Sequence, residues 1–175
     1  KNINRLIRSI NRQKSKKARE FSKKKSISFE IKAILSKWKN KKVDNFNVKV
    51  AFSFPISDFD KMLKEKKGIN FIFKGRRNIK SVADGKIVYV GKLSTYGDII
   101  IINHRNNIRS ILLGNFVIKV RKGASVKRKS VLGYVKSSKG NTSKLYMEVR
   151  KKNKRISLLS FFNRFKSKKM SRGKL

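Results

Sequence analysis

Short apolar runs separated by glycines constrain the fold of this chain more than any other feature of its sequence. Each run is too short for an independent helix and is rich in the β-branched residues that strands favour. The runs cover residues 69–73, 79–82, 87–90, 99–103, 108–113, 116–120, 131–135 and 145–149. Many short strands with close turn signals predict a mainly β protein, an antiparallel sandwich or open barrel, and not a parallel sheet with crossover helices.

Details within these runs predict how they are placed. The run 99–102 is apolar at every position, so we expect a strand that is buried on both faces. Asp84 and Gly85 are a tight-turn signal between two apolar runs. The only proline, Pro55, ends an apolar stretch that begins near residue 48, and residues 58–67 read as a polar connection.

The first 44 residues have a different pattern, typical of helices. Two apolar stripes with helical spacing predict two amphipathic helices that cover a hydrophobic surface, although a basic amphipathic helix can also lie on a membrane. A basic run at 14–25 between them reads as a solvated helix or a linker. The stripes are Ile3, Leu6, Ile7 and Ile10, and Ile31, Ile34, Leu35 and Trp38.

Composition narrows the chemistry that the chain can perform. Forty-nine Lys and Arg against nine Asp and Glu give a net charge of +40, which attracts any polyanion. The charge is spread over the whole chain, which is typical of codon bias in an AT-rich genome, while a selected nucleic-acid footprint is the alternative. No Cys and a single His exclude disulfides and thiolate or His-rich zinc sites, so composition argues against catalysis.

Four segments resemble, in order, the lysostaphin/LytM-type metallopeptidase domains. S-V-A-D-G-K-I-V-Y-V-G (81–91) resembles the A-x-A-D-G-x-V-x-x-A-G strand pair, and T-Y-G-D-I-I-I-I-N-H (95–104) resembles G-Y-G-N-x-V-x-I-x-H. Residues 120–133 resemble V-x-x-G-x-x-V-x-x-G-x-x-I-G, and L-Y-M-E-V-R (145–150) resembles the closing H-L-H-F-E-V-R strand. The resemblance covers about residues 45–163 and implies the β-rich LytM fold.

The resemblance also implies a zinc site whose ligands are missing here. In active members, zinc is held by the His and Asp of H-x-G-x-D and by the second His of H-L-H. This chain has Lys66 and Asn70 in the first segment, and Lys144 and Tyr146 in the second. The position of a further catalytic His falls near Gly114. A protonated Lys has no lone pair to donate, and Asn and un-ionised Tyr are poor zinc ligands, so the resemblance implies neither a metal, nor another cofactor, nor a catalytic residue.

Degenerate LytM domains of this kind resemble the EnvC-type murein hydrolase activators, whose closing strand carries S-L-Y-F-E. That likeness implies a non-catalytic domain that binds and activates a periplasmic N-acetylmuramoyl-L-alanine amidase during septal peptidoglycan splitting. It also implies a periplasmic location, and peptidoglycan or division-complex proteins as further partners, with no specific nucleic acid. The partner groove would be lined by Lys66, Asn70, Gly114, Lys144 and Tyr146, and Glu148 would pair with a lysine or be a solvated charge.

The expected organisation has three parts. Residues 1–44 form a basic helical extension, a possible remnant of a coiled coil or regulatory helix. Residues 45–163 form the degenerate LytM domain, and residues 164–175 form a disordered basic tail. Residues 158–165, at the boundary between these two parts, read as a short segment that packs back on the sheet. The alternative functions are an active zinc-dependent peptidoglycan endopeptidase, a basic nucleic-acid or ribosome-binding protein, and a wall-binding module without activator function.

Overall fold

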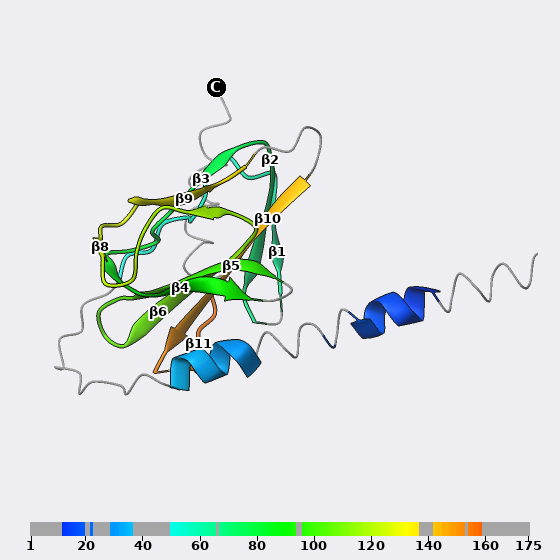
Figure 1. Cartoon of the computed structure of the whole chain (residues 1–175), viewed down its shortest axis with the longest axis horizontal. Helices are drawn as coiled ribbons and strands as arrows, with labels where there is room; N and C mark the ends of the chain where they lie inside the picture. The colour runs from blue at the N-terminus through cyan, green and yellow to red at the C-terminus, as the bar shows by residue number, and fades with distance from the viewer. Residues whose placement is uncertain are drawn as a thin grey trace, which may run out of the picture. The chain divides into compact units, whose positions relative to one another are not determined.

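The chain forms two compact units, Lys1–Lys39 and Asn40–Leu175. The computed structural model describes residues 12–19, 22, 29–36, 50–65, 67–93, 96–136, 142–152 and 154–158. The expectations for the first apolar stripe, for Trp38 and for the basic tail lie outside these residues. Helical segments occupy the described part of the first unit, and strands occupy the second (Figure 1).

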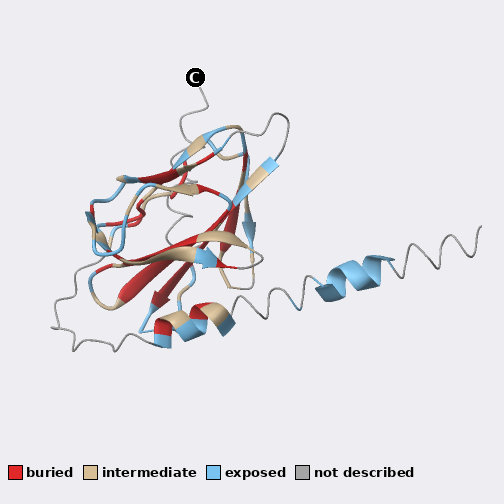
Figure 2. Ribbon diagram, in the orientation of Figure 1, coloured by how far each residue is buried: buried red, intermediate tan, exposed pale blue. Residues whose placement is uncertain are grey.

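Two helices, at 12–19 and 29–36, agree with the predicted helical extension. Every residue of helix 12–19 is exposed, as expected for a basic run with little apolar content (Figure 2). In helix 29–36, Ile31 and Leu35 are buried and Ile34 is half-buried, so the predicted stripe is the least exposed part of that helix. No helix in the described ranges has the length and hydropathy needed to cross a membrane.

The second unit is built from two antiparallel sheets, which confirms the predicted fold class (Figure 1). The larger sheet has the order β1-β2-β10-β6-β5-β4-β8, with β11 paired to β10, and the smaller has the order β3-β9-β7. Every strand pairing in both sheets is antiparallel. The strands are β1 (Lys61–Lys64), β2 (Ile69–Lys74), β3 (Arg77–Lys80), β4 (Gly85–Leu93), β5 (Gly97–Asn103), β6 (Ile108–Gly114), β7 (Val117–Ile118), β8 (Ser125–Val126), β9 (Val131–Val135), β10 (Thr142–Lys151) and β11 (Lys154–Arg155).

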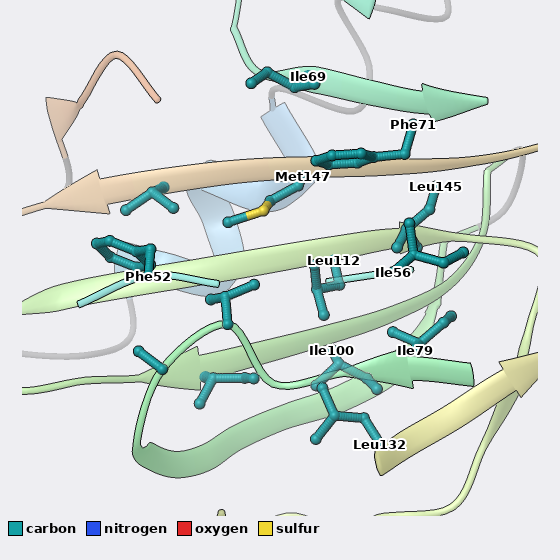
Figure 3. Close-up of a cluster of buried hydrophobic side chains, with 14 of the residues drawn as sticks. Phe52, Ile56, Ile69, Phe71, Ile79, Ile100, Leu112, Leu132, Leu145 and Met147 are labelled. Atoms are coloured by element: carbon teal, nitrogen blue, oxygen red, sulfur yellow. The ribbon is translucent and has the colours of Figure 1, made fainter. Parts of the chain in front are cut away.

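One hydrophobic core takes side chains from both sheets (Figure 3). Phe71 of β2, Leu112 of β6 and Met147 of β10 belong to it, as do Ile79 of β3 and Leu132 of β9. Burial of this apolar surface contributes about 25 cal/mol per Å² and is the main stabilising term of the second unit. The two sheets are therefore held against each other by side chains that the period-2 pattern places inward.

Strand β5 confirms the prediction for its four isoleucines. Residues 99, 100, 101 and 102 are all fully buried, and β5 lies inside the sheet between β4 and β6. Ile100 and Ile102 join the main core, whereas Ile99 and Ile101 face the other side of the sheet. Leu158 also packs into the core, as predicted for the start of the segment 158–165.

The prediction of a polar connection at 58–67 was wrong, because β1 lies within it. Lys61 pairs with Ile72 and Lys64 with Ile69, so this short strand forms one edge of the larger sheet. An edge strand uses one side of its backbone for pairing and needs little apolar burial, and lysines there discourage pairing with other chains. A hydrophobicity pattern therefore does not reveal it.

The turn at Asp84 and Gly85 connects the two sheets and closes no hairpin between β3 and β4. Gly85 is required there because a Cβ would approach the carbonyl oxygen of Asn103 to 2.6 Å and His104 Nδ1 to 2.8 Å. Asp84 Oδ1 accepts a hydrogen bond of 2.7 Å from the backbone N–H of Arg128. This turn therefore also anchors the loop that precedes β9.

His104 is buried beside the same turn, with both ring nitrogens bonded. Its Nδ1 lies 2.7 Å from the carbonyl oxygen of Asp84, which can only accept, so Nδ1 carries the proton. Nε2 then accepts from the Ser110 hydroxyl at 2.8 Å. Burial lowers the pKa of His104, partly opposed by the hydrogen bond to Asp84 and by its charge. His104 is therefore a neutral structural residue, outside the site described below.

The free energy of unfolding should fall as the pH drops below 6.5, the ordinary pKa of histidine. The unfolded chain binds a proton there while folded His104, with its lowered pKa, does not, so stability is full above 6.5 and is lost toward lower pH. Urea unfolding at pH 7.5 and pH 5 measures the difference for the natural chain and for His104→Gln. The pH dependence should shrink in the variant, and an unchanged dependence would contradict this role.

Candidate functional site

Three neighbouring strands bring together most of the residues that the sequence placed at the site. Asn70 of β2 lies directly opposite Tyr146 of β10, and Gly114 at the end of β6 lies opposite Leu145. Lys144 is two residues before Tyr146 on the same strand. Directly opposed residues have Cβ atoms about 5 Å apart, so Asn70 and Tyr146 are neighbours on one face of the sheet. Lys66, the fifth predicted residue, lies outside the described residues.

This face of the sheet is opposite to the main core. Leu145, Met147 and Val149 belong to the core, and Figure 3 shows Leu145 and Met147 in it. Tyr146 and Glu148 alternate with them and are joined by a hydrogen bond, which places both on the second face. We call the residues Asn70, Lys144, Tyr146, Glu148 and Arg150 on this face the β2/β10 site.

Glu148 is the centre of the site, and the sequence did not identify its role. One of its carboxylate oxygens, Oε1, accepts from Arg150 Nε at 2.5 Å and from Arg155 Nε at 3.1 Å. The other, Oε2, accepts from the Tyr146 hydroxyl at 3.0 Å. Only 2% of the Glu148 side chain and 3% of the Arg150 side chain are exposed. The expectation of a solvated charge or a lysine pair is thus wrong, because two guanidiniums hold this carboxylate in the protein interior.

The spacing of Glu148 and Arg150 was the available signal for this pair. Residues two apart on a strand share a face, and an acid and a base that share a buried face have to pair. Arg155 was harder to find, because it reaches Glu148 only after the chain reverses from β10 into β11. That reversal contains Lys152 at a positive φ of 47°. It has no glycine, the residue from which such a turn is usually predicted.

Tyr146 is held as a neutral hydrogen-bond donor. Burial raises the pKa of its hydroxyl far above the usual value, and the negative charge of Glu148 and the hydrogen bond to it raise it further. Arg155 and Arg150 oppose this only in part. The Tyr146 hydroxyl therefore donates a hydrogen bond to the Glu148 carboxylate and is not an anionic oxygen.

Asn70 also has a hydrogen-bond partner, Glu65. Gly68 lies close to the Tyr146 ring. Asn70 Nδ2 donates to Glu65 Oε1 at 3.0 Å. Glu65 in turn donates its backbone N–H to the carbonyl oxygen of Gly68 at 2.9 Å. A Cβ on Gly68 would overlap the carbonyl oxygen of Met147 and would lie 2.7 Å from the Tyr146 hydroxyl oxygen. The phenol therefore occupies the space that a side chain at residue 68 would need.

Lys144 lies at the outer end of the site, whereas Gly114 pairs with the core residue Leu145 and therefore lies on the core face, outside the site. Lys144 is exposed, whereas Gly114 is buried, and a Cβ on Gly114 would lie 3.0 Å from the carbonyl oxygen of Lys144. The strands thus approach closely here and leave an ammonium group at the surface. No carboxylate among the described residues forms an ion pair with Lys144.

These residues do not fit a catalytic zinc ion. Zinc in hydrolases is bound by neutral imidazole or anionic ligands with one open position. The β2/β10 site offers an amide whose NH₂ group is bonded to Glu65, a phenol that keeps its proton, and a carboxylate whose oxygens are bonded to two guanidiniums and that phenol. Within the described ranges, no three His, Asp or Glu side chains gather where they could hold a metal.

Comparison with known proteins finds a matching family model and several relatives. The model of peptidase family M23 matches residues 64–158, more than half of the chain. The chain is 36% identical over 87 residues to outer membrane antigenic lipoprotein B of Haemophilus influenzae, and 32% identical over 84 residues to the murein hydrolase activator NlpD of Escherichia coli. These matches cover 49% and 47% of this chain, but only 22% of the length of either relative.

A solved structure supports the same assignment at the level of the fold. An M23 peptidase candidate from Pseudomonas aeruginosa superposes with a TM-score of 0.62 at 19% identity, covering 78% of this chain and 60% of the other. The matched family segment runs from the end of β1 to Leu158, so it includes both sheets and the β2/β10 site. The chain therefore belongs to peptidase family M23.

Proposed function

We propose that this chain is a non-catalytic murein hydrolase activator, an M23 domain that binds a cell-wall hydrolase without cleaving peptidoglycan itself. The observation that carries this proposal is the β2/β10 site, whose polar atoms are bonded to one another in place of metal ligands. It is supported by relatives named murein hydrolase activators at 32% identity. The EnvC-type likeness of the closing strand belongs to this proposal as well.

The partner in this proposal is a periplasmic N-acetylmuramoyl-L-alanine amidase that splits septal peptidoglycan. The site is a rigid sheet surface, held by β2, β10 and β6 pairing, so its shape does not depend on a metal. A segment of the amidase docks on this face, with Lys144 at its exposed end and Tyr146 half-exposed beside it. Tighter binding of the active than of the blocked amidase conformation shifts the amidase toward activity. The periplasm is the proposed location.

We expect this chain to raise the rate of such an amidase by about 5- to 150-fold, corresponding to a coupling of about 1–3 kcal/mol. The measurement is release of dye-labelled fragments from peptidoglycan by a purified amidase, with and without this protein. Lys144→Glu should remove most of the gain by reversing the exposed charge at the site. Lys122→Glu makes the same change at an exposed turn residue outside the site and should keep it.

Two results would overturn the proposal. The first is the absence of any gain across several periplasmic amidases. The second is fragment release by this protein alone that a chelator stops, which would make it the zinc endopeptidase. Equal loss of the gain in both lysine variants would remove the β2/β10 site from the docking surface and contradict the proposed mode of binding.

A further inference from the structure

A hollow lies against the smaller sheet and shares no lining residue with the β2/β10 site. Its volume is about 590 Å³, and it is lined by Ser57, Asp58, Arg76, Arg77, Asn78 and Lys80. One wall is the turn at residues 57–58, and the other is β3 together with the turn that enters it. Gly75, at a φ of 72°, redirects the chain from β2 of the larger sheet into β3 of the smaller one. The fold thus places two consecutive arginines at the mouth of this hollow.

Hydrogen bonds join the side chains of Arg77 and Lys80 to residues of the opposite wall. Arg77 Nε donates to the carbonyl oxygen of Asp58 at 3.4 Å, and Arg77 Nη1 donates to that of Arg76 at 2.9 Å. Lys80 Nζ donates to the Ser57 hydroxyl at 3.3 Å, and its backbone N–H donates to the carbonyl oxygen of Pro55 at 2.7 Å. These neutral acceptors position the charges without cancelling them. Arg77 and Lys80 are therefore positioned at the hollow without a ligand.

The positive charge of the hollow is not balanced by the protein. Arg76, Arg77 and Lys80 form no ion pair with a carboxylate in the part of the chain that the structure describes. Asp58 is the single acid in the lining, so the six residues carry a net charge of about +2 at neutral pH. A fourth cation, Lys119, lies near the lining, because Arg76 lies 4.3 Å and Lys119 5.8 Å from the ring centroid of the same tyrosine, Tyr134.

The two cations at the ring of Tyr134 bear on the charge of the ligand that this hollow would bind. A tyrosine face attracts one cation by about 0.5–1 kcal/mol at an exposed site, whereas two cations at one ring repel each other. An anion held between Arg76 and the rest of the hollow would relieve this repulsion. Arginine matches the geometry of phosphate oxygens with paired N–H donors, and Ser57 and Asn78 offer neutral donors in the same lining.

We propose that this hollow is a binding site for a phosphate group, independent of the activator function. Arg76 and Arg77 would contact the phosphate oxygens, Lys80 would balance the remaining charge, and Asp58 would weaken binding by repulsion. The general attraction of a +40 chain for polyanions is the competing explanation. A test therefore has to separate a local site from net charge.

The test is a titration of the full chain with pyrophosphate, followed by amide NMR shifts and calorimetry at about 0.15 M salt. Saturable shifts should concentrate at residues 57–58 and 76–80. Arg76→Gln with Lys80→Gln should weaken binding at least about 10-fold, and Asp58→Asn should strengthen it about 3-fold, in line with charge-assisted hydrogen bonds. Lys61→Gln with Lys64→Gln removes the same charge from exposed positions of β1 and should change affinity less than about 2-fold.

Competition experiments distinguish the possible sources of the phosphate group, and several results would contradict the proposed site. Vesicles of phosphatidylglycerol that compete with pyrophosphate in the natural chain, but not in the Arg76→Gln/Lys80→Gln variant, would assign a lipid headgroup. Competition by inorganic phosphate alone would assign a small phosphate ligand. Equal weakening in the β1 control, shifts spread over the surface, or tighter binding of duplex DNA with no loss in the hollow variant would each overturn the proposal.

Discussion

Replacing Glu148 by glutamine is expected to lower the free energy of unfolding by about 3–5 kcal/mol, as when one partner of a buried ion pair is removed. The carboxylate accepts hydrogen bonds from Arg150, Arg155 and Tyr146, and it is almost completely buried. Without its charge, Arg150 is left as an uncompensated buried cation, and its Nη2 already lacks a hydrogen-bond partner among the described residues. Urea unfolding monitored by circular dichroism measures the loss.

A double variant provides the control for this prediction. In Glu148→Met with Arg150→Met, both buried charges are replaced by apolar groups of similar length, which is often nearly neutral. Arg155 is at the surface and can turn to water. We expect the double variant to recover most of the stability lost in Glu148→Gln. A loss below about 1 kcal/mol in the single variant would show that the pair is hydrated and that its burial is not the stabilising factor.

Gly68→Ala is expected to cost about 1–3 kcal/mol and to displace the Tyr146 ring, because there is no space for a methyl group at residue 68. Its Cβ would overlap the carbonyl oxygen of Met147, a backbone atom of β10 that cannot move without disturbing the pairing with β2. The Tyr146 hydroxyl would be pushed from Glu148 at the same time. Urea unfolding gives the stability change, and near-ultraviolet circular dichroism gives the change around the tyrosine.

Gly91→Ala is the matched control on the same sheet. Its Cβ would meet only side-chain atoms of Tyr89, at 2.6 Å from the hydroxyl oxygen, and that half-buried side chain can swing aside. We expect this substitution to cost less than about 1 kcal/mol and to leave the Tyr146 signal unchanged. Similar costs in both variants would mean that the loss is a general effect of replacing glycine by alanine and not of the contact with Met147.

Strands β5 and β9 are among those that the sequence predicted best. The residues 131–135 form β9 with the expected bounds, and the four isoleucines of β5 are buried as a continuous apolar run requires. Hydrophobic patterning succeeds there because burial is what fixes the strand. Strand β1 was missed because an edge strand rich in lysine is fixed by backbone pairing to β2, which leaves no mark in the apolar pattern.

The proximity of Asn70 and Tyr146 was predictable from the sequence, whereas their hydrogen-bond partners were not. Order and spacing of the motifs placed Asn70 and Tyr146 at one site, and the register of β2 and β10 sets them directly opposite each other. Glu65 directly follows β1 and Arg155 lies in the short strand β11, and the positions of both depend on tertiary pairing. The sequence motifs identify which zinc ligands are absent, but only the three-dimensional strand pairing shows which hydrogen bonds the substituted residues make.

The hydrogen bonds from two guanidiniums to Glu148 also determine what a single histidine substitution in the β2/β10 site would do. Restoring histidine at residue 146 alone would remove the phenol from Glu148 but leave both guanidiniums beside the new imidazole. Those cations would repel an incoming dication, so the first step toward hydrolysis loses stability and gains no metal. A metal site on this face would therefore require several simultaneous substitutions.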